Sequence, residues 1–321
     1  MVPSFSYKAS VYSMTVVVLS YNRMDELQLN IPDLIKYCIE LNYELIIVDN
    51  ASKMEVRSYL KNTIPNIENV MLLQNEANLG VAGGRNKAYA KAKGEYILSI
   101  DDDTKVSFEN LKILPDLMRQ KYKGVGILAI RVIHSKTHEE QNYFGEKELC
   151  VSNHHGAACV IRRKVLSMIG GIDEYCNFGS EEIDLCIRAH SAGFEIRYTP
   201  EIIVYHNNIP YQGIGFDDRV KKRVFNNART MHKYFPFLMA SQCANRYLGR
   251  MLLIYFKKNK YLFLINLLFS SLCGRVVGLY YHEYTPNNTV KYYNNKNLVP
   301  EFGNKPFYRN LIIKMIYKYK K

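Results

Sequence analysis

Short apolar runs alternate with amphipathic segments along the first 130 residues, and this alternation limits the fold more than any other feature. The runs at residues 16–19 and 45–48 have no polar face, as expected of strands covered on both sides. Alternation of such strands with helical patterns is typical of βαβ units. The sequence therefore predicts an α/β fold with a mostly parallel central sheet. Expected strands are 15–20, 44–49, 70–75, 95–100, 125–130, 156–162 and 202–206, and expected helices 24–41, 53–62, 84–92, 107–120, 163–169 and 180–192.

Positive charge gathers in the last third of the chain. Residues 1–215 hold 23 Lys and Arg against 26 Asp and Glu, whereas residues 216–321 hold 20 against 4. We expect a disordered leader at 1–13, a main domain at 14–215 and a basic, mainly helical module at 216–321. Within this module the expected helical stretches are 218–234, 240–281 and 308–319. Such a module indicates an anionic partner, either nucleic acid or membrane lipid. No nucleic-acid-binding motif is recognisable, which favours a membrane surface over nucleic acid.

Cysteine usage and the N-terminal segment bear on the compartment. The seven cysteines form no CxxC pair, so neither a disulfide framework nor a zinc site is indicated, and a reducing cytosol fits best. Residues 1–13 lack the apolar stretch of a signal peptide. The apolar run 261–273 is shorter than the about 20 residues that cross a bilayer. It predicts a buried helix or one that lies in the membrane interface.

Three consecutive aspartates, Asp101, Asp102 and Asp103, directly follow the apolar strand at 96–100. Buried carboxylates are costly without a cationic partner, and strand ends are where open α/β sheets bind ligands. A hard divalent cation suits clustered oxygens and usually brings phosphates with it. The triplet therefore predicts a metal–diphosphate site centred on Asp101 and Asp103. The alternative is a solvated acidic turn.

Two other strand ends carry polar residues. Tyr21 offers a flat face for stacking a base, and Asp49 offers an acceptor for a base imide N–H. The alternative for Asp49 is a turn that caps the next helix.

A glycine-rich segment, 78–88, precedes an expected helix. Glycines before a helix let backbone N–H groups approach a phosphate, and Arg85 can pair with phosphate oxygens. The segment is neither a dinucleotide-binding fingerprint nor a P-loop.

The order of these segments is more specific than any one of them. The chain contains, in succession, VVVLSYNR, IIVDNAS, NLGVAGGRNKA, ILSIDDDT and FGSEEIDLCIRAHSAGFEI. Together they resemble family 2 glycosyltransferases with the GT-A fold, particularly the rhamnosyltransferase-like group of bacterial surface-polysaccharide enzymes. The resemblance covers residues 14–210 and does not extend into the basic C-terminal third.

The resemblance implies a role for each strand end. Asp101 and Asp103 match the outer positions of the DxD motif, which binds Mn²⁺ or Mg²⁺ and the sugar nucleotide, and Asp102 would contact ribose or sugar. His206 falls where many members have another metal ligand; the alternative is a structural histidine. The residues that would hold the nucleotide are Tyr21, Asn22 and Asp49 for base and ribose, and Gly83, Gly84, Arg85 and Asn86 beside the phosphates.

The family's general base lies in a Glu-Asp-x-Asp segment, where this chain has Glu181-Glu182-Ile183-Asp184. Glu182 stands at the base position, and Glu181 and Asp184 are alternatives. These acids would otherwise simply stabilise a helix N-terminus. His154 and His155 line the acceptor site or lie in a surface loop.

The expected reaction is a single inverting displacement that moves a hexose from a nucleoside-diphosphate sugar to a hydroxyl of a glycan or lipid-linked acceptor. A membrane-bound acceptor would place the enzyme in the cytoplasm, on the inner face of the plasma membrane, with residues 216–321 on anionic lipid. Alternatively that module packs on the catalytic domain or forms a homodimer. Competing functions are a sugar nucleotidyltransferase and an inactive glycosyltransferase-like scaffold.

Overall fold

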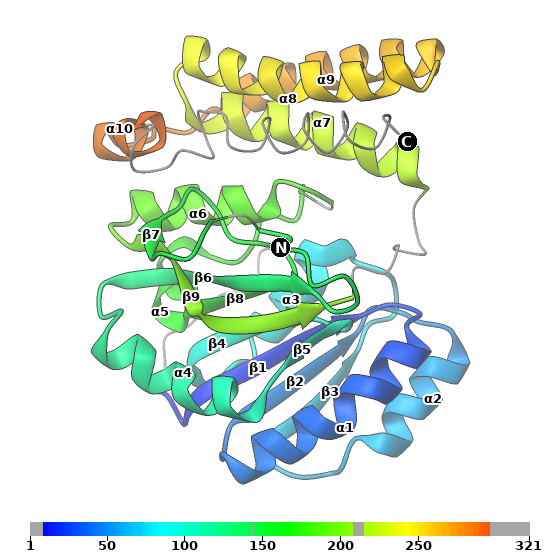
Figure 1. Ribbon diagram of the computed structural model, residues 1–321, viewed down its shortest axis with the longest axis vertical. Coiled ribbons are helices and arrows are strands. Elements are labelled where there is room, and N and C mark those ends of the chain that lie inside the picture. The colour runs from blue at the N-terminus through cyan, green and yellow to red at the C-terminus, as the bar shows by residue number, and fades with distance from the viewer. Residues whose placement is uncertain (1–8, 143, 177, 208–214, 296–321) are drawn as a thin grey trace. The chain divides into compact units, whose positions relative to one another are not determined.

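The computed structural model describes residues 9–142, 144–176, 178–207 and 215–295, which form two compact units. An α/β unit comprises Met1–Glu148 and Asn153–Gly215, and a helical unit comprises Leu149–Ser152 and Phe216–Lys321. Figure 1 shows the layered sheet of the first and the helices of the second.

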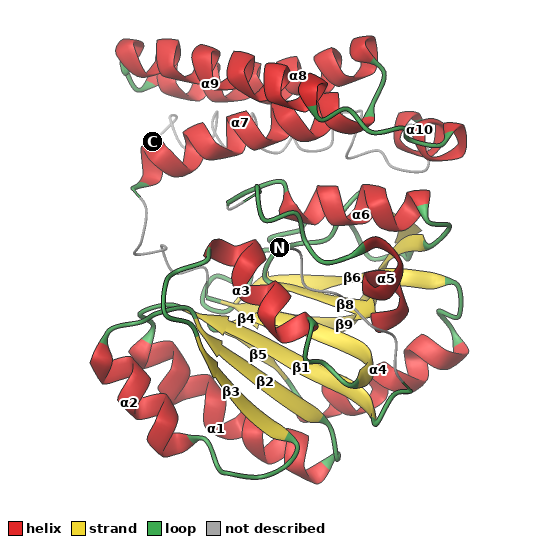
Figure 2. Ribbon diagram, turned by 180° about the vertical axis from the view of Figure 1, so that it is seen from behind, coloured by secondary structure: helices red, strands yellow, loops and turns green. Residues whose placement is uncertain are grey.

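The α/β unit is built on a sheet with strand order β3-β2-β1-β4-β8-β6-β9-β5 (Figure 2). Strand β1 pairs in parallel with β2 and β4, so these three strands end at the same edge of the sheet. Strand β8 runs antiparallel to β4 and β6, and β5 antiparallel to β9. The strands are β1 Tyr12–Ser20, β2 Glu44–Asp49, β3 Val70–Gln74, β4 Gly94–Asp101, β5 Thr104–Val106, β6 Val125–His134, β8 Ala158–Arg162 and β9 Glu195–His206.

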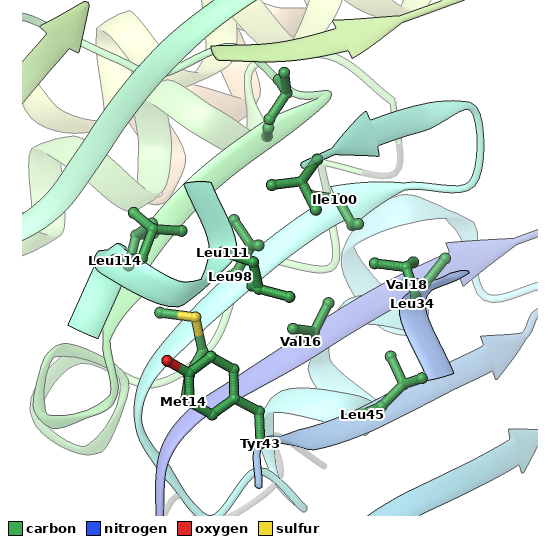
Figure 3. Close-up of a cluster of buried hydrophobic side chains, with 14 of the residues drawn as sticks. Met14, Val16, Val18, Leu34, Tyr43, Leu45, Leu98, Ile100, Leu111 and Leu114 are labelled. Carbon is green, nitrogen blue, oxygen red and sulfur yellow. The ribbon is translucent and has the colours of Figure 1, made fainter. Parts of the chain in front are cut away.

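Helices cover both faces of this sheet (Figures 1 and 2). They are α1 Met24–Glu40, α2 Met54–Thr63, α3 Gly80–Tyr89, α4 Phe108–Gln120, α5 Arg163–Ile169 and α6 Glu181–Ser191. Figure 3 shows one face of β1, β2 and β4 against α1 and α4. Each large apolar side chain buried there contributes about 1.5–3 kcal/mol, and this packing fixes the strand ends that carry the polar residues. The cluster includes Met14, Val16, Val18, Leu34, Leu45, Leu98, Ile100, Leu111 and Leu114.

The predicted α/β fold with a mostly parallel sheet is confirmed, but some strand bounds differ. Strand β5 was not predicted, because three residues are too few to show a period. Strand β9 begins at Glu195 and passes through a register shift near Pro200, which cannot donate to the ladder. Strand β1 begins at Tyr12, inside the expected leader, of which residues 1–8 lie outside the described chain.

The helical unit contains α7 Phe216–Tyr234, α8 Phe237–Lys257, α9 Tyr261–Tyr280 and α10 Asn287–Asn294, with the short strand β7 Leu149–Cys150. The sequence suggested one helical stretch over 240–281, but α8 and α9 are separated by a turn in which Asn259 has φ 55°. Side chains from α7, α8 and α9 form its core: Val220, Val224, Leu248, Tyr255 and Leu267. The expected helical stretch 308–319 lies outside the described residues.

Helix α9 continues past Arg275, so it has 20 residues. It is therefore longer than the apolar run 261–273, which is too short to span a bilayer. Among the described residues, α9 is the one helix that is both long enough and apolar enough to cross a membrane. This judgement rests on length and composition only. A single helix of this kind is weak support for a span, since core helices of soluble proteins pass the same test.

Candidate active site

The acidic triplet lies at the carboxyl end of β4, where the sheet brings a histidine to it. The β5–β9 pairing sets Thr104 opposite His206, and His206 Nε2 lies 3.1 Å from Asp103 Oδ1. One ligand atom from each of Asp101, Asp103 and His206 lies within 4.8 Å of the other two. Two carboxylates and one imidazole are a donor set that suits Mn²⁺. The structure therefore brings together the three predicted metal ligands, and their chemistry fits the ion.

The protein itself supplies cations to this cluster. Arg85 Nη2 lies 2.6 Å from Asp101 Oδ1, and Arg23 Nη1 lies 3.7 Å from Asp103 Oδ2. Burial, and then the Asp103 charge, raise the pKa of Asp102 to about 8. Burial also raises the pKa of Asp101, and the Arg85 guanidinium opposes that rise. Asp101 and Asp103 thus each have a cationic side chain within the fold, and Arg23 also opposes the rise in the pKa of Asp102, in addition to any external cation.

Gln141 orients the His206 ring and was missed by the sequence analysis. Its side-chain nitrogen donates to the His206 carbonyl at 3.1 Å, and its Oε1 accepts from His206 Nδ1. The Gln141 backbone N–H is fixed in turn to the Val132 carbonyl at 2.9 Å. A proton held on Nδ1 leaves the Nε2 lone pair toward the acidic cluster, which is how metal-binding histidines are usually oriented.

The glycine-rich segment acts differently from the prediction. Helix α3 begins at Gly80, so Gly83 and Gly84 lie inside the helix and not before it. A Cβ at Gly84 would come within 2.5 Å of Leu19 Cδ1, so this glycine permits close packing of α3 on β1. The prediction that Gly83 and Gly84 lie in a turn before a helix, with their N–H groups free to approach a phosphate, is therefore wrong.

The same helix places Arg85 and Asn86 in buried positions. Arg85 also donates to the Gly156 carbonyl at 2.8 Å. Burial alone would lower the pKa of Arg85, but the surrounding acidic groups, Asp101 foremost among them, together raise it. The Asn86 side chain donates to the Ile172 carbonyl and accepts from its N–H, both at 2.8 Å. Arg85 thus borders the acidic cluster, whereas Asn86 joins α3 to the loop before α6.

The loops after β1 and β2 hold the residues predicted to bind base and ribose. Asp49 is fully buried; its Oδ1 accepts from Ser52 N at 3.0 Å, and its Oδ2 lies 3.4 Å from Arg57 Nε. Asn22, with φ 55°, donates its backbone N–H to Ser52 Oγ at 2.9 Å. Tyr21 is partly buried in the same loop. The Asp49 contacts fit a turn but not a cap, because the N-cap residue of α2 is Lys53 and this cap has no side-chain hydrogen bond; the nucleotide roles stay predictions.

The three acids at the start of α6 have different surroundings. Asp184 is fully buried, and its Oδ2 accepts from Arg188 Nε at 2.9 Å and Nη2 at 2.7 Å, so it stabilises the helix. Glu181 is also buried. Glu182 lies beside Gly156, since a Cβ there would be 2.5 Å from Glu182 Oε1. Its charge helps to raise the pKa of Asp101, so Glu182 borders the acidic cluster.

His154 and His155 do not lie in an exposed surface loop. The His155 ring centroid lies 5.7 Å from that of His206. His154 is buried and donates from Nδ1 to the His155 carbonyl at 2.9 Å. Burial lowers the pKa of His154 to about 4, so its ring is neutral at physiological pH.

Comparison with known proteins identifies the class. Residues 15–167 match glycosyl transferase family 2, which confirms the resemblance seen in the motifs. Over this segment the chain is similar to the family 2 glycosyltransferases, and the α/β unit has the GT-A fold.

Individual relatives are distant. The uncharacterized protein y4gI of Sinorhizobium fredii is 22% identical over 256 residues, which cover 68% of this chain and 27% of that protein. The putative teichuronic acid biosynthesis glycosyltransferase TuaG of Bacillus subtilis is 28% identical over 108 residues, or 34% of this chain and 42% of TuaG. The chain therefore spans less than half the length of these relatives.

A solved structure of mannosyltransferase PcManGT from Pyrobaculum calidifontis, in complex with GDP-Man and Mn²⁺, is similar over 87% of this chain and 88% of that one. Its TM-score is 0.55 at 16% sequence identity, a likeness that shows the fold alone.

Proposed function

We propose that the chain is a metal-dependent, inverting glycosyltransferase that moves a hexose from a nucleoside-diphosphate sugar to a hydroxyl group. The observation that carries the proposal is the convergence of Asp101, Asp103 and His206 at the carboxyl edge of the sheet. The family match and the Mn²⁺ in the PcManGT complex support it.

The residues of the cluster divide the work. Asp101, Asp103 and His206 would hold Mn²⁺ or Mg²⁺, which acts as a Lewis acid on the leaving diphosphate when bound. Arg85 fixes Asp101 and Gln141 fixes His206, so two of the three ligands are held in place before the donor arrives.

Glu182 is the proposed general base. It borders the cluster across Gly156, where a carboxylate can take the proton of an incoming hydroxyl. Asp184 is a poor candidate because Arg188 already engages its carboxylate. Since no covalent nucleophile takes part, the displacement is single and the anomeric configuration inverts.

The acceptor is proposed to be a glycan or a lipid-linked oligosaccharide of surface-polysaccharide synthesis, reached from the cytoplasm. The similarity to TuaG, whose description refers to teichuronic acid biosynthesis, supports this choice. Tyr21, Asn22 and Asp49 keep their proposed positions around the base and ribose.

One experiment tests donor chemistry directly. Purified protein is incubated with UDP-, dTDP- and GDP-hexoses, with Mn²⁺, Mg²⁺ or a chelator, and thermal stability and nucleoside diphosphate release are followed. We expect one donor to stabilise the protein and to be cleaved only with a metal. Loss of transfer with retained donor binding in Glu182→Gln would support the base. Pyrophosphate release from a sugar phosphate and a nucleoside triphosphate would instead favour a nucleotidyltransferase.

A further inference from the structure

Helix α9 has two faces with different neighbours. Residues Leu267, Ser271, Gly274 and Gly278 are buried on one face. A Cβ at Gly274 would come within 2.2 Å of the Phe225 carbonyl oxygen, and one at Gly278 within 2.4 Å of that of Arg229, so this face contacts the α7 backbone. Figures 1 and 2 both show α9 alongside α7 and α8 in the helical unit.

The opposite face of α9 is exposed along the whole helix, and we call it the α9 stripe. Its side chains are between 47% and 83% exposed, and they recur at alternating intervals of three and four residues. An uninterrupted exposed stripe of this length exceeds the scattered apolar residues of ordinary surfaces and indicates a large apolar partner. The stripe consists of Leu262, Ile265, Phe269, Leu272, Val276 and Leu279.

The charges around the stripe are mainly positive, although Lys260 at the start of α9 pairs with Asp217 of α7, whose Oδ2 lies 2.7 Å from Lys260 Nζ. No Asp or Glu occurs between residues 219 and 282. Within α8, α9 and their connecting turn the charged residues are all basic, and Lys257, Lys258 and Lys260 are exposed where α9 begins. The charged residues are Arg246, Arg250, Lys257, Lys258, Lys260 and Arg275.

We propose that α9 lies in the plane of an anionic phospholipid bilayer surface, with the α9 stripe immersed and the neighbouring Lys and Arg side chains near the headgroups. Exposed tyrosines at both ends of the helix, Tyr261 and Tyr280, suit the boundary between headgroups and acyl chains. An apolar surface whose surrounding charge is mainly positive complements anionic lipid. This proposal is independent of the donor chemistry.

Two other occupants fit less well. A second copy seated on the stripe would bring the basic residues of α8 and α9 face to face. This disfavours association, because α8, α9 and their turn contain no carboxylate and Asp217 of α7 is already paired with Lys260. A spanning α9 would take α7 with it, because their backbones are in close contact. Helix α7 has eight Asp, Lys and Arg residues, and charged side chains are costly in the bilayer core.

The test uses the full chain and vesicles of phosphatidylcholine, either alone or in equal mixture with phosphatidylglycerol. We expect co-sedimentation with the anionic vesicles only, weakened by added salt. Leu262→Gln with Phe269→Gln should weaken partition roughly a hundredfold, because two large side chains lose their apolar environment. Lys257→Gln should weaken it about fivefold. The matched control is Leu29→Gln with Ile113→Gln, exposed apolar residues of α1 and α4, and should bind as the unchanged protein does.

Orientation is measured by fluorescence, because the chain contains no tryptophan. Single substitutions Leu262→Trp, Phe269→Trp and Val276→Trp should shift to the blue on anionic vesicles and be quenched equally by shallow brominated lipids. If the depth of the tryptophan in the bilayer, measured by quenching, changed steadily from position 262 to 276, α9 would span the membrane and the proposal would be overturned. A dimer that dissociates in the Gln variant while no form binds vesicles would also overturn it. Retained donor cleavage in the Gln variant separates this outcome from failure of the proposed enzyme activity.

Discussion

The α/β unit buries charged side chains, whereas the helical unit exposes large apolar ones. In the first, carboxylates lie inside the fold beside cations: Asp101 beside Arg85, Asp103 beside Arg23, and Asp184 beside Arg188. In the second, large apolar side chains such as Leu262 and Phe269 are turned outward. Paired charge within a fold prepares it for a small polar ligand, whereas exposed apolar surface prepares it for an extended partner. The contrast can be tested on both sides.

The largest effect is expected at Asp103. Asp103→Asn keeps the shape of the side chain but removes a ligand charge, so Mn²⁺-dependent release of nucleoside diphosphate should fall roughly a thousandfold. Circular dichroism should show an unchanged fold. Asp116→Asn, on an exposed part of α4, is the matched control and should retain full activity. Unchanged turnover in Asp103→Asn would contradict the metal assignment.

The next effect is on stability. Asp184→Asn leaves Arg188 without its buried counterion and should lower the free energy of unfolding by about 3 kcal/mol. Glu195→Gln removes an exposed partner of Arg197 and should cost less than about 1 kcal/mol. Urea unfolding measures both. Equal losses would show that the buried pair has no special structural role.

Acid should weaken the α/β unit through His154. Its pKa in the folded protein is lowered from 6.5 to about 4, so the unfolded chain takes up a proton that the folded chain does not. The contribution is present above pH 6.5 and is lost progressively as the pH falls toward about 4. Relative to His154→Asn, the protein should lose about 3 kcal/mol over this window. Chemical unfolding at a series of pH values measures it; parallel curves for the two proteins would contradict the assignment.

A smaller effect is expected at Gln141. Gln141→Leu frees the His206 ring, and Mn²⁺ affinity measured by electron paramagnetic resonance should weaken about 10–100-fold. Gln120→Leu, on an exposed residue of α4, is the control. Because the readout is ion binding without donor, a general loss of activity cannot imitate the result. Equal affinity in both variants would remove Gln141 from the site.

The smallest effect lies in the helical unit and compares two glycines. A Cβ at Gly249 meets nothing within 4 Å, so Gly249→Ala should stabilise α8 by about 0.5–1 kcal/mol. Gly274→Ala should have the opposite sign, because its Cβ would strike the α7 backbone. Thermal unfolding compares them. Equal shifts would indicate that α7 and α9 are not closely packed.

The sequence predicted features that depend on local periodicity and order. The apolar runs of β1 and β2 identified the sheet, and the acidic triplet identified the strand end that the structure joins to His206. Gln141 escaped because it lies in a segment without period and acts on a residue 65 positions away. Arg23 was visible in the first motif, but its approach to Asp103 depends on how the chain leaves β1.

Other errors had local causes. The glycines of α3 suggested a turn. Glycine is also needed inside a helix that packs closely on a strand, as α3 packs on β1, so the sequence alone did not separate the two cases. The break between α8 and α9 was missed although Asn259 marks it, since asparagine tolerates positive φ better than most residues.

The bare backbone at Gly156 has a consequence for how such an enzyme can change. A methyl group at this position would meet the end of a flexible side chain, and the Glu182 carboxylate would have to swing aside. The chemical identity of the proposed base is thus set at position 182, whereas its orientation depends on position 156. A substitution at position 156 would therefore be expected to lower the proposed transfer activity even though every acidic residue in the sequence is unchanged.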